Sequence, residues 1–130
     1  MKKSVVVLIL IFISGGIFAQ KAGILTFAKE EHDFGTIKEA DGKKSYTFEF
    51  MNTGNAPLII TNVEPSCGCT SPEWTKKPVL PGEKGFIVIT YDPKNRPGKF
   101  EKSIAVSSNA ANHMVTLIIS GEVIPLNIEK

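Results

Sequence analysis

The 130-residue sequence predicts an all-β domain, an immunoglobulin-like antiparallel β-sandwich of seven to eight strands. Three observations lead to this prediction. Apolar and polar residues alternate along several short runs, which is the period of a strand with one buried face. Turn sequences rich in Gly, Asn and Pro separate the runs, and the runs recur at intervals of roughly 8 to 12 residues, as in a sandwich. A small antiparallel barrel is the competing arrangement, since it also buries one face of each strand.

The N-terminus has the plan of a secretory signal peptide over residues 1–19. Lys2 and Lys3 give a positive start, residues 5–13 are all apolar, and small residues precede the expected cleavage site after Ala19. A membrane-spanning helix needs about 20 apolar residues, and this run is too short for one. We therefore expect an exported protein, periplasmic or secreted, with no stable membrane anchor after cleavage.

Residues 20–130 are expected to form a single immunoglobulin-like β-sandwich domain. The chain has 15 basic and 13 acidic residues, and the leader contains two of the lysines, so cleavage leaves 13 of each. A neutral domain without a strong basic cluster offers no electrostatic footprint for nucleic acid or an anionic membrane. A chain of about 110 residues can fold on one core.

Eight strands are expected, in the following order. They lie near residues 24–28, 32–37, 44–51, 58–63, 69–75, 84–91, 99–107 and 113–124. Tyr46, Phe48 and Phe50 share one face of the third strand, and the last strand has the same alternation. The run 86–91 is apolar or β-branched throughout, which predicts a central strand covered on both faces. Gly, Asn and Pro punctuate the connections, where positive or fixed φ angles are needed.

Cys67 and Cys69, the only two cysteines, are separated by Gly68 between two expected strands. An exported protein can form disulfides. We expect Gly68 to let the backbone fold tightly enough to bring the two Cα atoms within the roughly 4.4–6.8 Å that a bridge needs. Such a small loop removes little chain entropy, less than about 2 kcal/mol, so stapling the fold is a weak reason for the bond. A disulfide between Cys67 and Cys69 is our main interpretation.

Two other interpretations of this pair stay open. A redox-active thiol pair would have to work without the helix start that lowers a thiol pKa in Cys-x-x-Cys proteins. A soft-metal site for copper or zinc would use both thiolates, but two ligands are too few for a closed zinc site. The soft side chains that could supplement it are His32, Met51, His113 and Met114. Cys67 and Cys69 are thus the only metal candidates, and we expect no cofactor.

No set of catalytic residues emerges from the sequence. His32 precedes Asp33, but no nucleophile motif accompanies them, and a surface histidine at a strand start is the simpler interpretation. Residues 82–85 lack the Gly-Lys-Ser/Thr ending of a phosphate loop. Trp74 is expected to be a packing element of the core. We therefore expect a protein that is not an enzyme.

Short motifs along the domain resemble one bacterial family. They are His32–Ile37, Phe48–Gly54, Pro57–Ile60, Ser66–Thr70, Pro72–Trp74, Pro81–Glu83, Tyr91–Pro93, Gly98–Phe100 and Ser107–Asn109. Their order and spacing, from about residue 27 to about residue 124, are similar to those of the domain of unknown function 1573 family, with Cys-Gly-Cys-Thr the most diagnostic. The resemblance implies an immunoglobulin-like fold of the class that includes Hydin-type and sperm-protein-like domains, in exported proteins of Gram-negative bacteria. It implies no enzyme activity.

Two functions of different classes follow from these observations. The first is an exported binding or assembly module of the bacterial envelope, which presents its loops or a strand edge to another envelope protein or polymer. The alternative is a thiol-redox or soft-metal protein that acts through Cys67 and Cys69. The oxidation state and metal content of the native protein would separate the two.

Overall fold

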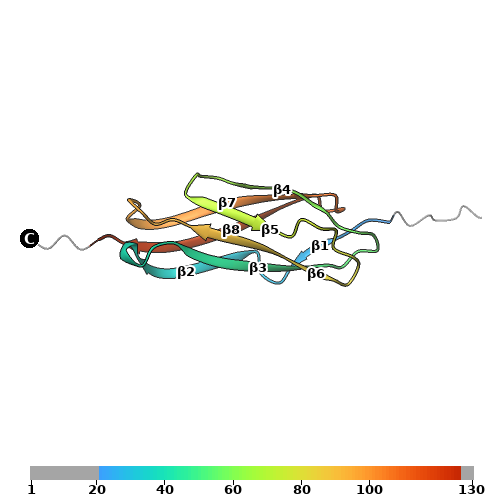
Figure 1. Cartoon of the computed structure of the whole chain (residues 1–130), viewed down its shortest axis with the longest axis horizontal. Helices are drawn as coiled ribbons and strands as arrows, with labels where there is room; N and C mark the ends of the chain where they lie inside the picture. The colour runs from blue at the N-terminus through green and yellow to red at the C-terminus, as the bar shows by residue number, and fades with distance from the viewer. Residues whose placement is uncertain (1–20, 127–130) are drawn as a thin grey trace, which may run out of the picture.

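The alternating patterns form eight strands in a computed structural model that describes residues 21–126 (Figure 1). The expected signal peptide, residues 1–19, lies outside the described residues. The strands are β1 (Leu25–Phe27), β2 (Glu31–Lys38), β3 (Lys44–Asn52), β4 (Ile60–Pro65), β5 (Thr70–Trp74), β6 (Lys84–Tyr91), β7 (Gly98–Ser108) and β8 (Met114–Ile124). A single 3₁₀ turn, η1 (Glu39–Asp41), follows β2. Within residues 21–126 no helix is long and apolar enough to cross a bilayer.

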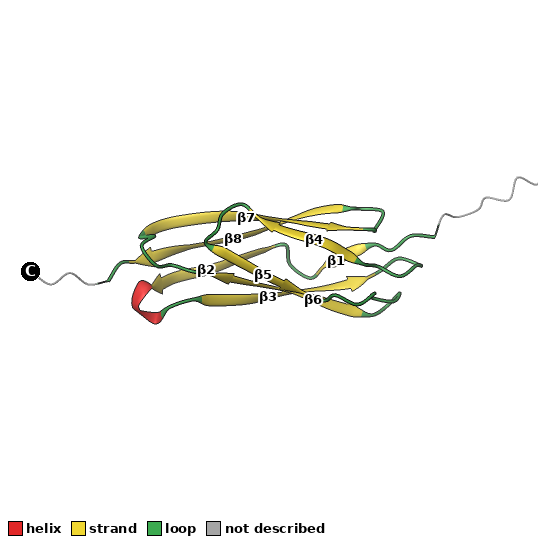
Figure 2. Cartoon of the chain, turned by 45° about the horizontal axis from the view of Figure 1, so that its top comes forward, coloured by secondary structure: helices red, strands yellow, loops and turns green. Residues whose placement is uncertain are grey.

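The strands pair into two four-stranded sheets, in the orders β1-β3-β6-β5 and β2-β8-β7-β4. With β1 and β2 as two halves of the first strand, these orders match the ABED and CFG sheets of an immunoglobulin domain. All pairs are antiparallel except β2 with β8, which run parallel. The two sheets lie face to face as layers (Figure 2). The immunoglobulin-like sandwich predicted from the sequence is therefore confirmed.

The core lies between the two sheets and is built from alternate positions of their strands. Its fully buried large side chains are Phe48, Phe50, Leu58, Ile87, Ile89, Tyr91, Ile104, Val106, Leu117, Ile119 and Val123. One prediction about β6 is wrong. The strand is central in its sheet, but only one face is buried, and Phe86 on the other face is 46% exposed. A two-layer sandwich has nothing to cover its outer faces, so an apolar sequence run does not guarantee burial on both sides.

The strand registers sort the connections into two groups at opposite ends of the sandwich. Tyr91 at the end of β6 lies opposite both Lys44 and Thr70, so the β2–β3, β4–β5 and β6–β7 connections meet at one end. We call this group, residues 39–43, 66–69 and 92–97, the disulfide end. The β3–β4, β5–β6 and β7–β8 connections and the start of β1 lie at the opposite end, to the right in Figure 1. The β1–β2 connection crosses from one sheet to the other part-way along the sandwich, where it bonds to Glu49 and Ile118.

Candidate functional site: the Cys67–Cys69 turn

Backbone hydrogen bonds hold the β4–β5 turn at the disulfide end. On the β4 side, the Ser66 amide donates to the Ser103 carbonyl (2.9 Å), and the Ser103 amide donates to Oγ of Ser66 (3.2 Å). On the β5 side, the Asp92 amide donates to the Cys69 carbonyl (2.9 Å). Across the turn, the Thr70 amide donates to the Cys67 carbonyl (3.4 Å). The turn is thus fixed at both sides by contacts that do not involve sulfur.

The structure joins Cys67 and Cys69 as a disulfide, with their Cα atoms 5.3 Å apart. The two cysteines differ in exposure. Cys69 is 3% exposed and belongs to the core, whereas Cys67 is half-buried and packs against the core from outside. A reagent in solution therefore meets Cys67 first.

Gly68 is exposed at the tip of this turn. Its φ angle is outside the left-handed region, and apart from its two chain neighbours no atom lies within 4 Å of a Cβ atom built on it. An alanine would fit the same backbone. The two Cα atoms lie within the range expected from the sequence, but Gly68 reaches this arrangement without a positive φ angle. What the missing side chain leaves is an exposed tip between the two cysteines.

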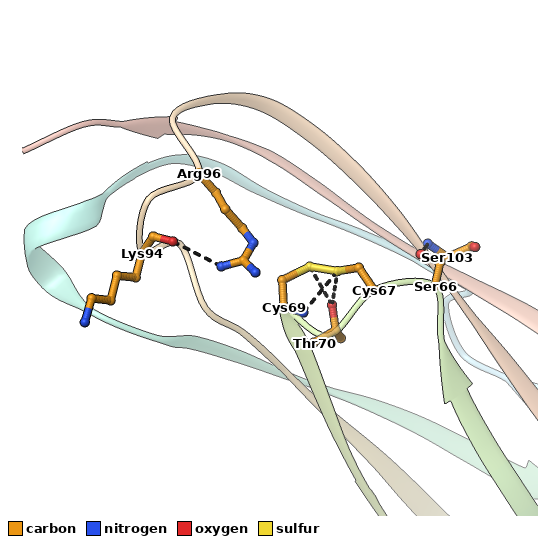
Figure 3. Close-up of a disulfide and its surroundings, with 7 residues drawn as sticks. All are labelled: Ser66, Cys67, Cys69, Thr70, Lys94, Arg96 and Ser103. Atoms are coloured by element: carbon orange, nitrogen blue, oxygen red, sulfur yellow. Dashed lines mark hydrogen bonds between the residues drawn. A yellow bond between two sulfur atoms is a disulfide. The ribbon is translucent and has the colours of Figure 1, made fainter.

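Hydrogen-bond donors converge on both sulfur atoms. The Cys69 amide lies 3.2 Å from Sγ of Cys67, and Oγ1 of Thr70 lies 3.7 Å from Sγ of Cys67 and 3.6 Å from Sγ of Cys69. From the β6–β7 connection, the Arg96 side chain points toward the disulfide, while the Lys94 ammonium points away from it (Figure 3). The Lys94 carbonyl accepts a hydrogen bond from Nη1 of Arg96 (3.0 Å), which fixes the guanidinium in this position.

The β2–β3 and β6–β7 connections of this end are tied together by the carboxylate of Glu39. Its Oε1 accepts a hydrogen bond from the Asn95 amide (2.8 Å), and its Oε2 accepts one from the Leu126 amide (3.0 Å). These two bonds are the main reason that the pKa of Glu39 lies below its usual 4.5. A carboxylate that is charged at neutral pH thus joins one loop to the next and to the segment after β8.

The structure does not bring the predicted supplementary metal ligands to the cysteines. Met51 pairs with Lys84 at the far end of β6 from Tyr91, about 23 Å away at strand spacing. His113 is the last residue of the β7–β8 connection and Met114 the first residue of β8, also at the opposite end. No group of three or more His, Cys, Asp or Glu side chains placed to hold a metal occurs among residues 21–126.

His32 lies on β2, at the other edge of its sheet from β4. Its ring stacks on that of Tyr46, with centroids 3.6 Å apart and planes at 8°, and packs edge-on against Phe34. Burial is the main cause that lowers the pKa of His32, with a further contribution from the positive charge of Lys29. This histidine closes the side of the sandwich between β2 and β3, which is a packing role.

Trp74 ends β5 and packs, half-buried, against the core, as expected from the sequence. The ammonium of Lys76 lies 3.0 Å from the centroid of its ring. Trp74 is four residues beyond Thr70 along an extended strand, so its ring lies well away from the sulfur atoms.

Sequence reasoning missed two members of the site. Arg96 is 27 positions from Cys69 in the sequence, and only the pairing of β6 with β5 brings its loop to the turn. Thr70 was visible as part of Cys-Gly-Cys-Thr, but a hydroxyl that reaches both sulfur atoms depends on its side-chain direction at the start of β5. No sequence signal identified Arg96.

Comparisons with known proteins give a family and a fold. A family model described as "Protein of unknown function (DUF1573)" matches residues 25–123, most of the chain. None of the curated proteins compared with the chain matches it.

Several solved structures share the fold at low sequence identity. A crystal structure of a protein of unknown function from Porphyromonas gingivalis W83 matches with a TM-score of 0.70 and 17% identity, over 85% of this chain and 51% of that one. The VesB protease of Vibrio cholerae matches with 0.62 and 16%, over 78% and 32%. The YadV chaperone matches with 0.51 and 13%, over 82% and 54%. The chain thus spans about half of the Porphyromonas protein, and these likenesses show the fold alone.

Proposed function

Because the chain belongs to the DUF1573 family, whose description names no activity, we propose a function from the site itself: an exported immunoglobulin-like module of the bacterial envelope that binds another envelope protein or polymer through its disulfide end. Export rests on the signal-peptide pattern of residues 1–19.

The observation that carries this proposal is that the connections at the disulfide end are bonded to one another. The Asp92 amide joins the β6–β7 connection to Cys69, and Glu39 joins it to the β2–β3 connection. Loops on a rigid sandwich that are held in one arrangement lose little conformational entropy when a partner binds. This end therefore has the preorganised surface that a binding module requires.

The strand edges offer less to a partner than the loops do. β1 has three residues, and β5 contains Pro72. The register is irregular in the middle of β2 and at the start of β4. Short strands, prolines and bulges are the devices that keep sheet edges from pairing with another chain. Strand addition is therefore the less favoured of the two binding modes.

Charge also favours a protein or polymer partner. The disulfide end carries three acidic residues (Glu39, Asp41 and Asp92) and three basic ones (Lys43, Lys94 and Arg96). An end with balanced charges offers charged hydrogen-bonding groups of both signs. It does not have the positive surface potential that attracts nucleic acid.

Site-directed photo-crosslinking in the native cell tests the binding role. A photoreactive phenylalanine analogue replaces Lys94 at the disulfide end, and a matched variant carries it at the exposed Thr53 of the opposite end. A discrete crosslinked species from position 94 that is absent from position 53 is expected. Equal crosslinking from both positions, or none from position 94, would contradict the proposal.

Fractionation of the same cells tests export. The mature chain should be found outside the cytoplasm, and its mass should correspond to a start at Gln20. A cytoplasmic chain that keeps residues 1–19 would contradict this part of the proposal.

A further inference from the structure

We propose that the Cys67–Cys69 disulfide is a redox site, which accepts two electrons from an exported dithiol protein by thiol–disulfide exchange, with Sγ of Cys67 as the sulfur that is attacked. This activity goes beyond the binding role above, and the two can fail separately, since a chain can bind a partner without exchanging its disulfide.

The first argument is that the turn does not depend on the bond. The hydrogen bonds of Ser66 with Ser103, and of the Cys69 carbonyl with Asp92, fix both sides of the turn without sulfur. A bridge between residues two positions apart also closes a very small loop, so it adds little to the stability of the fold. A bond that opens and closes here leaves the sandwich intact, which a redox site requires.

The second argument is access to one sulfur atom. Cys67 is half-buried, Cys69 is 3% exposed, and the exposed Gly68 between them carries no side chain. An attacking sulfur has to reach one of the two sulfur atoms from solvent, and the difference in exposure makes Cys67 the one that it reaches. The structure thus leaves Cys67 open and keeps Cys69 behind it.

The third argument is that the surroundings stabilise thiolates. Oγ1 of Thr70 reaches both sulfur atoms, and the Cys69 amide points at Sγ of Cys67. The Arg96 guanidinium faces the bond from the neighbouring loop (Figure 3). Hydrogen-bond donors and a nearby cation lower the pKa of a thiol, and a thiol of lower pKa is a better leaving group in exchange.

The exchange balances in two steps. A thiolate of the dithiol protein attacks Sγ of Cys67, the intermolecular S–S bond forms, the Cys67–Cys69 bond breaks, and its electron pair passes to Sγ of Cys69. The second thiolate of the partner then attacks the partner's own sulfur in the mixed disulfide and releases Cys67 as a thiolate. The domain gains two electrons and, from solvent, two protons, while the partner dithiol is oxidised to a disulfide.

The test begins with the oxidised mature chain and dithiothreitol, read as the mass of the alkylated protein against time. The folded wild type should be reduced without denaturant. Arg96→Gln should react about three- to tenfold more slowly, because it removes the cation beside the thiolates. Arg96→Lys should restore most of the rate, and Lys99→Gln, a charge control at an exposed lysine of β7 outside the disulfide end, should react like the wild type. Equal rates for the two Gln variants, or reduction only after unfolding, overturn the proposal.

Two single-cysteine variants test which sulfur is attacked. With dithiobis(nitrobenzoate), the Cys67 thiol of Cys69→Ser should react about tenfold faster than the Cys69 thiol of Cys67→Ser, because of its exposure. Reduced thioredoxin serves as the protein dithiol probe for the wild type and should reduce it to completion in excess. Equal reactivity of the two thiols, or no reduction by thioredoxin, overturns the proposal. Thermal melts of both variants confirm that the thiols are compared in the same fold.

Discussion

Gly85 is a residue at which the absence of a side chain is required by packing. It lies opposite Phe50 in the β3–β6 pair, and a Cβ atom on it would overlap the Phe50 ring. The glycine thus makes room for a fully buried aromatic ring. Gly68 is the opposite case, because a Cβ there meets nothing within 4 Å beyond its two chain neighbours.

We therefore expect Gly85→Ala to lower the free energy of unfolding by about 1–3 kcal/mol, the usual cost of overpacking a core. Gly68→Ala, the matched control, should change it by less than about 0.5 kcal/mol, as for an exposed surface position. Urea denaturation measures both. If overlap with the Phe50 ring causes the loss of stability in Gly85→Ala, adding Phe50→Leu should recover part of that loss. Equal losses for Gly85→Ala and Gly68→Ala would contradict a packing role for Gly85.

The stabilising effect of the disulfide is also a residue-scale question. Replacing both Cys67 and Cys69 by serine should cost less than about 2 kcal/mol, because the closed loop is so short. The variant should therefore fold, with a circular dichroism spectrum like that of the wild type. Urea denaturation of the variant and of the oxidised wild type gives the difference. A loss as large as that from a core truncation, about 3 kcal/mol or more, would assign a structural role to the bond.

At the scale of elements, Glu39 connects η1 with the β6–β7 connection and with the segment after β8. The hydrogen bonds from the Asn95 and Leu126 amides hold the pKa of Glu39 below 4.5 in the folded chain. The folded state therefore binds this proton less tightly than the unfolded state does. The resulting stabilisation is fully present above pH 4.5 and is lost as the pH falls through the folded pKa.

Glu39→Gln should accordingly melt at a lower temperature than the wild type at neutral pH. The difference should shrink as the pH is lowered below 4.5, because the wild-type carboxyl is then protonated as well. Thermal melts of both chains over a series of acidic buffers measure this convergence. A gap that stays constant, or widens in acid, would show that the carboxylate charge does not link these elements.

Period-two alternation, apolar runs and turn residues together were sufficient to predict the strands. The eight expected strands agree with the observed ones to within about two residues at each end, the usual uncertainty of such boundaries. Alternation shows which residues point inward, but not how many layers a fold has. For this reason the apolar run of β6 was wrongly expected to be covered on both faces.

Only those site residues that are close together in the sequence could be predicted from it. Cys67 and Cys69 are close in the sequence, so the chance of a bridge could be argued from spacing. Arg96 reaches them only because β5 pairs with β6, a contact between distant segments. The freedom of the backbone at Gly68 was also hidden, since a glycine in a turn looks the same whether its φ angle requires it or not.

At the scale of the whole molecule, the segment before and within β1 joins the two sheets at the opposite end. On one side, the Ile24 amide donates to Oδ1 of Asn52, a fully buried residue of β3. On the other side, Asn112 of the β7–β8 connection accepts from the Leu25 amide (2.9 Å) and donates to the Leu25 carbonyl (2.7 Å). An asparagine of β3 and one of the connection between two strands of the other sheet thus hold the neighbouring residues Ile24 and Leu25.

This arrangement predicts coupling between the two asparagines. Asn112→Ala should lower the free energy of unfolding by about 1–3 kcal/mol, because it leaves both Leu25 groups without their partner. Asn52→Ala should cost more, because its side chain also donates to the Ala56 and Val79 carbonyls (both 2.8 Å). Once either substitution releases the segment, the second substitution removes hydrogen bonds that are already broken. The double variant should therefore lose less than the sum, by about 0.5 kcal/mol or more.

Urea denaturation of the four chains of this cycle measures the coupling, and hydrogen exchange locates it. In Asn112→Ala the amides of residues 22–27 should exchange faster, while those of β3 and β6 keep most of their protection, because local opening of an edge strand need not unfold the core. Asn55→Ala is the control, since its exposed side chain accepts one hydrogen bond, from the Ala22 amide, near the same segment. It should show neither the larger loss nor the coupling with Asn52. Strictly additive losses in the cycle would mean that β1 is held separately by each sheet and does not join them.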